Sequence, residues 1–321
     1  MIEAEMASLA EEVSGIISSL LQKEDPLFKS AYHLPSHGGK RMRPYLVIKS
    51  CEAVGGEKES AVTPAAAVEL LHNFTLVHDD IMDNDIMRRG VPTVHVLWGT
   101  PTAILAGDLL FAEAFDAILG STLDDYRARR VASILAKATI RLSVGQFQDM
   151  SFEGRDDILE EEYLEMISGK TATLFRACAE IGAVIGGGRE EIIAKLGEYG
   201  WNLGMAFQIF DDYLGMTSSE DELGKSVGND LREGKKTLIV IKGMQTKSKD
   251  AIKSLLGNRN TPQAELSSLI SSLREEGVLD YVRGKAMGYV EDAKRALSCL
   301  PDSNPKESLV QLVEFAVKRR K

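Results

Sequence analysis

The stretch AVTPAAAVELLHNFTLVHDDIMDNDIM, residues 61–87, joins a long apolar pattern to an acidic cluster. Its apolar residues recur at spacings of three and four, which predicts a helix. Asp79, Asp80 and Asp83 follow in the same helical stretch. An unpaired carboxylate in an apolar setting is very costly, so this cluster indicates that a cation neutralises it.

Helical periodicity continues through the rest of the chain. The segments that carry it are 1–22, 44–55, 61–87, 101–120, 124–153, 158–185, 189–216, 235–257, 262–274, 277–299 and 305–320. Thr63 with Pro64, and Thr100 with Pro101, stand where helix starts are expected. Alternating strand patterns are nearly absent. The polar, Gly-rich segment 217–234 is expected to be a loop beside the second acidic cluster.

No Pro-, Gly- or Ser-rich linker divides the 321 residues, of which 44% are apolar. We therefore expect one domain over 1–321. Its fold class is all-α, a bundle of about ten or more helices around a central catalytic cavity.

Charge and cysteine content exclude several classes of protein. The net charge of −10 argues against a nucleic-acid or anionic-membrane binder, which needs a basic face. No apolar run reaches the roughly 18 residues of a membrane span. Cys51, Cys178 and Cys299 are odd in number and widely spaced, which indicates reduced thiols. The acidic N-terminus is not a targeting signal, so we expect a cytoplasmic location.

The spacing of the first acidic cluster suits a metal. On an ideal helix Asp79 and Asp83 share a face, and His72 lies about 10 Å down the axis on nearly the same stripe. Mg²⁺ takes one or two carboxylates plus waters and substrate phosphates. A solvated acidic face is the alternative interpretation.

The second cluster is FQIFDDYLG, residues 207–215, in which Gln208, Asp211 and Asp212 fall on adjacent faces. Gly215 stands where a third acid would pair with Asp211. Glycine inside a helix costs about 1 kcal/mol relative to alanine, so Gly215 is also consistent with a helix end. A structural cap or an exposed acid pair is the alternative here. Two such clusters that face each other would hold a diphosphate between them.

Basic residues favour the phosphate interpretation. GGKRMRP, residues 38–44, places Lys40, Arg41 and Arg43 after a glycine pair, and Arg88 and Arg89 follow the first acidic cluster. Arginine binds phosphate in a bidentate manner, and lysine supplies a compact charge. Each basic group alone is consistent with a solvated patch, but two of them around a carboxylate helix indicate a site.

SGKTA, residues 168–172, has the letters of a nucleotide-binding loop. A P-loop needs glycine five residues before its second glycine, where this chain has Leu164. The preceding segment is also helical rather than a strand. An NTPase is therefore rejected.

Taken together, these motifs resemble the trans-isoprenyl diphosphate synthases, or polyprenyl synthetases. The motifs in the family's order are GGKRMRP, LVHDDIMDNDIMRRG, AGDLL (106–110), GQFQD (145–149), SGKTA, FQIFDDYLG, GNDLREGKKT (228–237) and PDSNPKESL (301–309). The resemblance implies an isoprenoid synthase-type bundle, usually a homodimer. It also implies a Mg²⁺-dependent head-to-tail (1'-4) condensation of isopentenyl diphosphate with an allylic diphosphate.

The resemblance also implies roles for single residues. The diphosphate of isopentenyl diphosphate would be held without metal by Lys40, Arg43, His72 and Arg89. The ligands of about three Mg²⁺ ions would be Asp79, Asp83 and Asp211, with Asp80 and Asp212 as supporting acids. The allylic diphosphate would be contacted by Arg88, Lys170, Lys225 and Lys235. The residues near the reacting carbons would be Thr171 and Gln208.

Product length is expected to depend on Phe74 and Thr75, upstream of Asp79. An aromatic residue five positions before the first motif is similar to the archaeal-type geranylgeranyl (C20) class, so C20 is expected, with C15 or C25 as alternatives. On an ideal helix Thr75 shares the face of Asp79, whereas Phe74 lies about 140° away. The role of Phe74 therefore follows from the resemblance.

Two other functions remain open at this point. A class I terpene cyclase shares the ionisation step but has no use for the basic residues Lys40, Arg43 and Arg89. A non-catalytic subunit of a heteromeric synthase finds support in Gly215 alone, which replaces the acid common in the family. Asp230 is a candidate to supply a water-mediated contact in its place.

Overall fold

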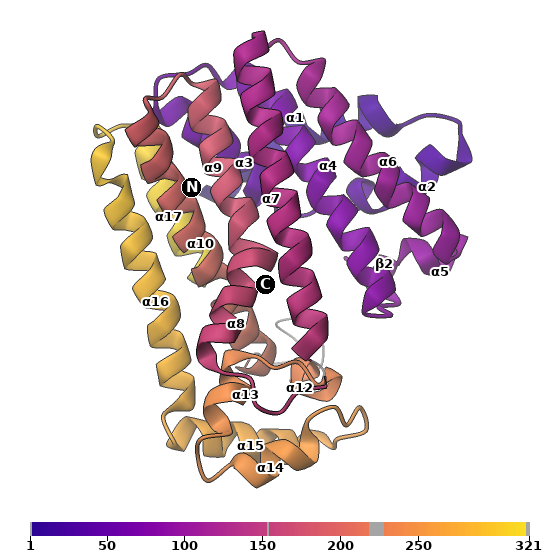
Figure 1. Cartoon of the computed structure of the whole chain (residues 1–321), viewed down its shortest axis with the longest axis vertical. Coiled ribbons are helices and arrows are strands. Elements are labelled where there is room, and N and C mark those ends of the chain that lie inside the picture. The colour runs from indigo at the N-terminus through magenta and orange to yellow at the C-terminus, as the bar shows by residue number, and fades with distance from the viewer. Residues whose placement is uncertain (1, 153, 218–227, 319–321) are drawn as a thin grey trace. The chain divides into compact units, whose positions relative to one another are not determined.

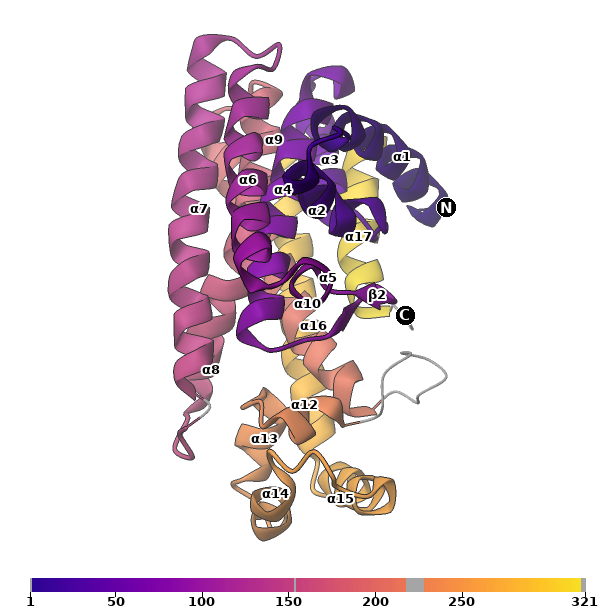
Figure 2. The same ribbon diagram turned by 90° about the vertical axis from the view of Figure 1, so that its right-hand side faces the viewer.

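The computed structural model describes residues 2–152, 154–217 and 228–318, shown in two views in Figures 1 and 2. Most of these residues lie in helices, and the sheet they form is a hairpin of two-residue strands. The expected all-α fold class with about ten or more helices is therefore confirmed.

The elements of the first half in chain order are α1 (Ile2–Leu21), α2 (Pro26–Ser36), α3 (Met42–Ala53), α4 (Lys58–Met82), β1 (Met87–Arg88), β2 (Val91–Pro92), α5 (Val94–Trp98), α6 (Thr100–Leu119) and α7 (Asp125–Phe152). Those of the second half are α8 (Glu160–Ile167), the π-helix η1 (Ser168–Ala172), α9 (Thr173–Ile185), α10 (Glu190–Thr217), α12 (Asn229–Glu233), α13 (Leu238–Gly243), α14 (Lys249–Leu255), α15 (Gln263–Glu275), α16 (Val278–Ala296), the 3₁₀ turn η2 (Leu297–Cys299) and α17 (Asn304–Lys318). The two strands pair antiparallel, with Met87 opposite Pro92 and Arg88 opposite Val91.

The chain forms two compact units, each assembled from three separated stretches. Unit 1 comprises Met1–Ala136, Ala177–Gly197 and Cys299–Leu309. Unit 2 comprises Lys137–Arg176, Glu198–Ser298 and Val310–Lys321. The boundaries fall inside helices or turns rather than in linkers. The expectations of one domain and of a central cavity stay predictions.

Unit 1 is built around α4, which packs against α6, α3 and α1 (Figure 1). Small residues let α4 and α6 approach closely, and Ala65 on α4 and Ala103 and Ala106 on α6 are fully buried. A Cβ atom at Gly107 would lie 2.1 Å from His78 Nε2. The absence of a side chain at Gly107 therefore allows the His78 imidazole of α4 to sit against α6.

Unit 2 holds its C-terminal helices together through α16. The residues of α16 that are buried recur at helical spacing, as Val282, Ala286, Val290 and Ala293 do. Figure 2 shows α13, α14 and α15 gathered near one end of this helix, and α13 and α15 pack against it. Glu160, the first residue of α8, joins the group through ion pairs to Lys242 at 2.6 Å and Lys285 at 3.0 Å.

Several predicted helix boundaries are wrong. Helix α4 begins at Lys58, so Pro64 lies inside the helix rather than at its start. It ends at Met82, because the chain turns beyond it through Asn84 and Arg89, which have positive φ angles of 54° and 52°. The start near Pro101 is confirmed, since α6 begins at Thr100.

Longer predicted helices prove to be divided, and short ones were not predicted. The predicted helix 158–185 consists of α8, η1 and α9, and the predicted helix 235–257 is broken between α13 and α14. The predicted loop 217–234 contains the last residue of α10 and the short helix α12, while its residues 218–227 lie outside the described part. Helices α2 and α5 were not expected. None of the helices among the described residues is long and apolar enough to cross a membrane.

Candidate functional site

Unit 1 contains a basic cluster made of Arg41, which is buried, and of Arg43, His72 and Arg89, which are partly buried. Arg41 is the N-cap residue of α3 and has a left-handed backbone conformation, with φ of 48°. Arg41 is only 4% exposed. Its guanidinium donates to Glu69 Oε1 at 2.5 Å and to Pro35 O at 2.6 Å. The carboxylate of Glu69 therefore neutralises the buried guanidinium of Arg41 and fixes the start of α3.

Two predicted phosphate-binding residues meet beside this ion pair. Arg43 Nη1 lies 3.1 Å from His72 Nε2. Burial, reinforced by the charges of Arg43 and Arg89, holds the pKa of His72 well below its usual range. His72 is therefore a neutral imidazole at pH 7, so it adds hydrogen-bonding capacity to the cluster without a further charge.

Arg89 reaches the same cluster from beyond the acidic motif. Its Nη1 donates to Leu34 O at 3.0 Å and to Asn73 Oδ1 at 3.2 Å. A Cβ atom at Gly39 would lie 3.1 Å from Arg89 Nη2, so the bare backbone of Gly39 makes room for this guanidinium. Lys40, the next residue, is exposed. The structure thus brings Arg43, His72 and Arg89 together, with Lys40 at the edge.

The first acidic cluster lies at the C-terminal end of α4. The backbone N–H of Asp83 donates to Asp79 O at 2.8 Å, so the two residues are one helical turn apart and both are partly exposed. Asp80 is buried, forms an ion pair with Arg88, and burial raises its pKa to about 6 despite that pair. Its second oxygen, Oδ2, is buried without a hydrogen-bond partner among the described residues.

Phe74 belongs to a row of aromatic side chains. Its ring centroid lies 5.4 Å from that of Phe111 on α6, and Phe111 lies 5.0 Å from Phe115. Thr75 is buried, and its hydroxyl donates to His72 O within the same helix. Phe74 therefore faces the aromatic face of α6, whereas Thr75 is packed inside.

In unit 2, the π-helix η1 carries the SGKTA motif. π-helical turns are rare and occur frequently at functional sites. A Cβ atom at Gly145 of α7 would lie 2.2 Å from Lys170 N, and one at Gly204 of α10 would lie 2.5 Å from Ala172 Cα. Only glycine at these two positions lets both helices approach the backbone of η1 so closely.

A chain of hydrogen bonds connects η1 to the second acidic cluster. Thr171 donates to Gln208 Oε1 at 2.7 Å, and Gln208 Nε2 donates to Asp212 Oδ1 at 2.8 Å. Tyr163 on α8 donates to the other oxygen, Asp212 Oδ2, at 2.7 Å. Burial, with Asp230 nearby, raises the pKa of Asp212 to about 8. The predicted site residues Thr171, Gln208 and Asp212 are thus held in one fixed arrangement.

The predicted lysines Lys170 and Lys235 of unit 2 are each paired with acidic side chains. Lys170 Nζ forms an ion pair with Asp149 at 2.5 Å, and Lys235 Nζ lies 2.9 Å from Glu233 and 3.8 Å from Asp230. Asp211 is exposed on α10. The predicted residue Lys225 lies outside the described residues.

Gly215 has a close acidic neighbour. A Cβ atom at this position would lie 2.7 Å from Asp230 Oδ2, and Gly228 N donates to Gly215 O at 3.0 Å. The Asp230 carboxylate therefore lies where a side chain at position 215 would project. An acid is present beside α10 even though the motif itself lacks one there.

Sequence reasoning missed four polar residues of these arrangements: Glu69, Asn73, Asp149 and Tyr163. For Glu69 there was a signal, because a carboxylate inside the apolar run AAAVELL must have a buried partner. Asn73, four residues later, shares its helix face and donates to Glu69 Oε1 at 3.1 Å. Tyr163 gave no signal, because a buried tyrosine is usually only a core residue.

The acidic residues occur in small sets rather than in complete metal cages. Among residues 2–152, 154–217 and 228–318 there is no group of three or more His, Cys, Asp or Glu side chains arranged to hold a metal. Asp79 with Asp83 in unit 1, and Asp211 with its neighbours in unit 2, are sets of oxygen donors. Such sets suit Mg²⁺, which is usually bound by one or two carboxylates together with substrate phosphates.

Known proteins resemble the whole chain. The family model described as polyprenyl synthetase matches residues 24–273. A geranylgeranyl diphosphate synthase of Saccharolobus solfataricus is 46% identical over 92% of this chain and 91% of its own length. A geranylfarnesyl diphosphate synthase of Aeropyrum pernix is 42% identical over 92% of this chain and 95% of its own. The crystal structure of a geranylgeranyl pyrophosphate synthetase from Pyrococcus horikoshii is 42% identical and superposes with a TM-score of 0.94, covering 99% of this chain and 98% of that one.

Proposed function

Because the chain belongs to the polyprenyl synthetase family and is a prenyltransferase, we propose that it condenses isopentenyl diphosphate with an allylic diphosphate. The product we propose is all-trans geranylgeranyl diphosphate, C20. Several relatives named for this product support it, while the relative named for geranylfarnesyl diphosphate keeps C25 as the alternative.

One observation carries this proposal. Helix α4 holds residues of two chemically different anion sites, the basic cluster at His72 and the acidic pair at Asp79 and Asp83. A synthase that joins two diphosphate substrates needs both, one bound by protein cations and one bound through metal ions. A terpene cyclase binds a single diphosphate and would leave the basic cluster without a function.

The acids fit Mg²⁺, and Asp79, Asp83 and Asp211 are the residues we propose as its ligands. The orphaned Oδ2 of Asp80, which is buried directly beside Asp79, is a suitable acceptor for a water on such an ion. When bound, Mg²⁺ would neutralise the charge that develops on the departing diphosphate.

The side chains have separate tasks in this proposal. Arg43, Arg89 and the neutral imidazole of His72 bind and orient isopentenyl diphosphate, so that its double bond meets the allylic cation before water does. Lys170 and Lys235 add positive charge to the allylic diphosphate. Thr171 and Gln208, fixed through Asp212 and Tyr163, present ordered dipoles near the reacting carbons.

Asp230 weakens the alternative of a non-catalytic subunit. That alternative depends on the missing acid at Gly215, yet a carboxylate lies beside this position. We propose that Asp230 supplies the contact that the motif lacks.

The proposed function is tested by incubating the purified protein with labelled isopentenyl diphosphate, one allylic primer and increasing Mg²⁺. A longer prenyl diphosphate is expected, with activity lost on adding a chelator and restored by Mg²⁺. A hydrocarbon or alcohol would instead identify a cyclase. No product at any Mg²⁺ concentration would identify a subunit.

Phe74→Ala is expected to shift the product from C20 towards C25 and longer chains, because removing the ring opens the aromatic row with Phe111. Chain length is measured by chromatography of the dephosphorylated products. The matched control is Phe28→Ala on α2, whose ring lies under Lys23 Nζ rather than in this row. The proposed role of Phe74 is wrong if both variants give the parental distribution.

We also propose that the chain is a homodimer and cytoplasmic. Helix α6 exposes large apolar side chains, including Ile104, Leu105 and Leu119, which are 45%, 54% and 63% exposed. Such a surface is typical of an interface between subunits. Leu105→Asp is expected to shift the species seen by sedimentation velocity towards the monomer, and a dimer that persists unchanged in this variant would rule out α6 as the interface.

A further inference from the structure

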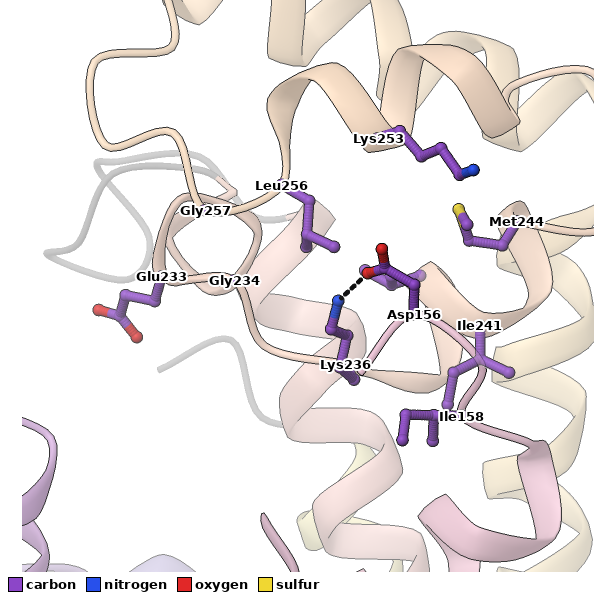
Figure 3. Close-up of a pocket in the computed structure, with 11 residues that line it drawn as sticks. Asp156, Ile158, Glu233, Gly234, Lys236, Ile241, Met244, Lys253, Leu256 and Gly257 are labelled. Atoms are coloured by element: carbon purple, nitrogen blue, oxygen red, sulfur yellow. Dashed lines mark hydrogen bonds and ion pairs between the residues drawn. The ribbon is translucent and has the colours of Figure 1, made fainter. Parts of the chain in front are cut away.

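Unit 2 contains a pocket of about 510 Å³ that none of the proposed roles uses (Figure 3). It lies between α13, α14 and the segment after α7 that contains Asp156 and Ile158. Its lining is mixed: Ile158, Ile241, Met244 and Leu256 supply apolar surface, and two lysines and two acids supply polar surface. A volume of this size is in the range of small-molecule sites.

The charges inside the pocket do not cancel. Figure 3 shows Glu233 directed away from the pocket centre, and its carboxylate pairs with Lys235 at 2.9 Å. Lys236 and Lys253 therefore face a single carboxylate, that of Asp156. Apart from Glu233, the pocket lining therefore carries an excess of one positive charge, with Lys253 and Asp156 exposed at its rim.

The ion pair in the pocket is asymmetric. Lys236 Nζ lies 2.9 Å from Asp156 Oδ1, but the lysine side chain is 9% exposed and the aspartate side chain 77% exposed. A buried ammonium needs a partner, whereas an exposed carboxylate is well hydrated without one. A ligand anion can therefore replace Asp156 at Lys236 while Asp156 returns to water.

The pocket is also connected to a predicted substrate contact. Lys236 follows Lys235 directly, in the segment between α12 and α13. Helix α12 is joined to the chain just after α14 by a hydrogen bond from Gly257 N to Leu231 O at 2.8 Å, and Lys235 N donates back to Asp230 O of α12 at 2.9 Å. A ligand that displaces Lys236 would therefore also shift the adjoining backbone, which positions Lys235.

We propose that this pocket binds a small amphiphilic anion, with its carboxylate or phosphate between Lys236 and Lys253 and its apolar body against Ile241, Met244 and Leu256. Fatty carboxylates and prenyl monophosphates share this chemistry. Occupancy changes the position of Lys235 and so the affinity for the allylic diphosphate. This last step rests on the proposed function, whereas binding itself does not.

Binding is measured by titration calorimetry on the full chain without Mg²⁺ or substrates. The probes are octanoate and geranyl monophosphate. Two control compounds are used: 1-octanol has the alkyl chain but no charge, and acetate has the carboxylate but no long alkyl chain. Octanoate is expected to bind with a Kd on the order of 1 mM, given the ligand efficiency of small molecules. A tighter Kd for geranyl monophosphate would identify prenyl monophosphates as the source, and a tighter Kd for octanoate would identify fatty carboxylates.

Two lysine variants on the same helix separate the pocket from other anion sites. Lys253→Gln removes a pocket cation and is expected to weaken binding of both probes about tenfold, as expected for a lost charge-assisted contact. Lys249→Gln removes an exposed cation of α14 that does not line the pocket, and binding is expected to be unchanged. Equal binding by both variants, or no octanoate binding to the parent chain, would overturn the proposal.

The link to the substrate has its own measurement. Octanoate is expected to raise the KM for the allylic diphosphate without changing that for isopentenyl diphosphate, and the effect should be absent in Lys253→Gln. Octanoate binding without this change in KM would disprove the link and leave the binding site in place. An inactive parent chain would instead refute the proposed function, because the calorimetry needs no turnover.

Discussion

Asp79→Ala is expected to lower kcat for chain elongation by a factor on the order of 10³, because loss of one group that stabilises developing negative charge typically has an effect of this size. Asp79 lies one turn before Asp83, at the C-terminal end of α4. The substitution removes one of the three carboxylates proposed as metal ligands and leaves Asp83 as the only one of them in unit 1. The rate is measured with labelled isopentenyl diphosphate at saturating Mg²⁺.

The basic cluster should be unaffected by this substitution. The KM for isopentenyl diphosphate is expected to stay within about twofold, since Arg43, His72 and Arg89 keep their contacts. The matched control is Glu59→Ala, which removes an exposed carboxylate from the first turn of the same helix and should leave kcat unchanged. If Asp79→Ala kept more than about a tenth of the parental kcat, the acidic pair would not be the metal site.

A second large effect is expected on stability. Arg41→Ala should lower the free energy of unfolding by about 3–5 kcal/mol, since it leaves the buried carboxylate of Glu69 without its main partner. Arg41 and Glu69 have side chains only 2% and 3% exposed. The remaining donors to Glu69, Asn73 at 3.1 Å and Arg89 at 3.9 Å, cannot replace a direct ion pair. Urea unfolding followed by circular dichroism measures the loss.

A neutral replacement and a surface pair serve as controls. The double variant Arg41→Met with Glu69→Gln removes both charges and should recover much of the lost stability, because no buried charge then remains unpaired. Lys29→Ala removes the ammonium that pairs with the exposed Glu24, and it should unfold as the parent does. A single Arg41→Ala variant as stable as Lys29→Ala would show that the buried pair contributes nothing net.

Helix periodicity predicted the fold class well because it depends on burial, which repeats over many turns. It could not predict η1, because the change from α- to π-hydrogen bonding at Ser168–Ala172 leaves the apolar pattern of 158–185 nearly unaltered. The end of α4 was missed for a related reason. Ile86 and Met87 continue the apolar pattern, but both side chains are exposed and the chain has already turned into the hairpin.

The short helix α2 was missed although its sequence carried a signal. Asp25 caps it by accepting a hydrogen bond from Leu27 N at 2.8 Å, and Pro26 opens the first turn. An acid followed by proline is a typical helix start, but eleven residues are too few for periodicity to be clear.

The candidate site was predictable where chemistry fixes the residue type, and less so where packing does. Clustered acids and arginines are expensive unless they bind something, so Asp79, Arg43 and Arg89 could be identified from sequence. The contacts that hold these side chains in place could not be predicted from the sequence. That Tyr163, distant in sequence, holds Asp212 follows only from the way α8 and α10 pack in unit 2.

The division of the chain has a consequence for its biosynthesis. Neither unit is contiguous, since unit 1 is completed by Cys299–Leu309 and unit 2 by a segment that begins at Val310. Proteins with contiguous domains can fold from the N-terminus while the ribosome is still at work. Here the N-terminal stretches of the nascent polypeptide make no complete unit, and neither unit can finish folding until the segments Cys299–Leu309 and from Val310 onwards have been synthesised.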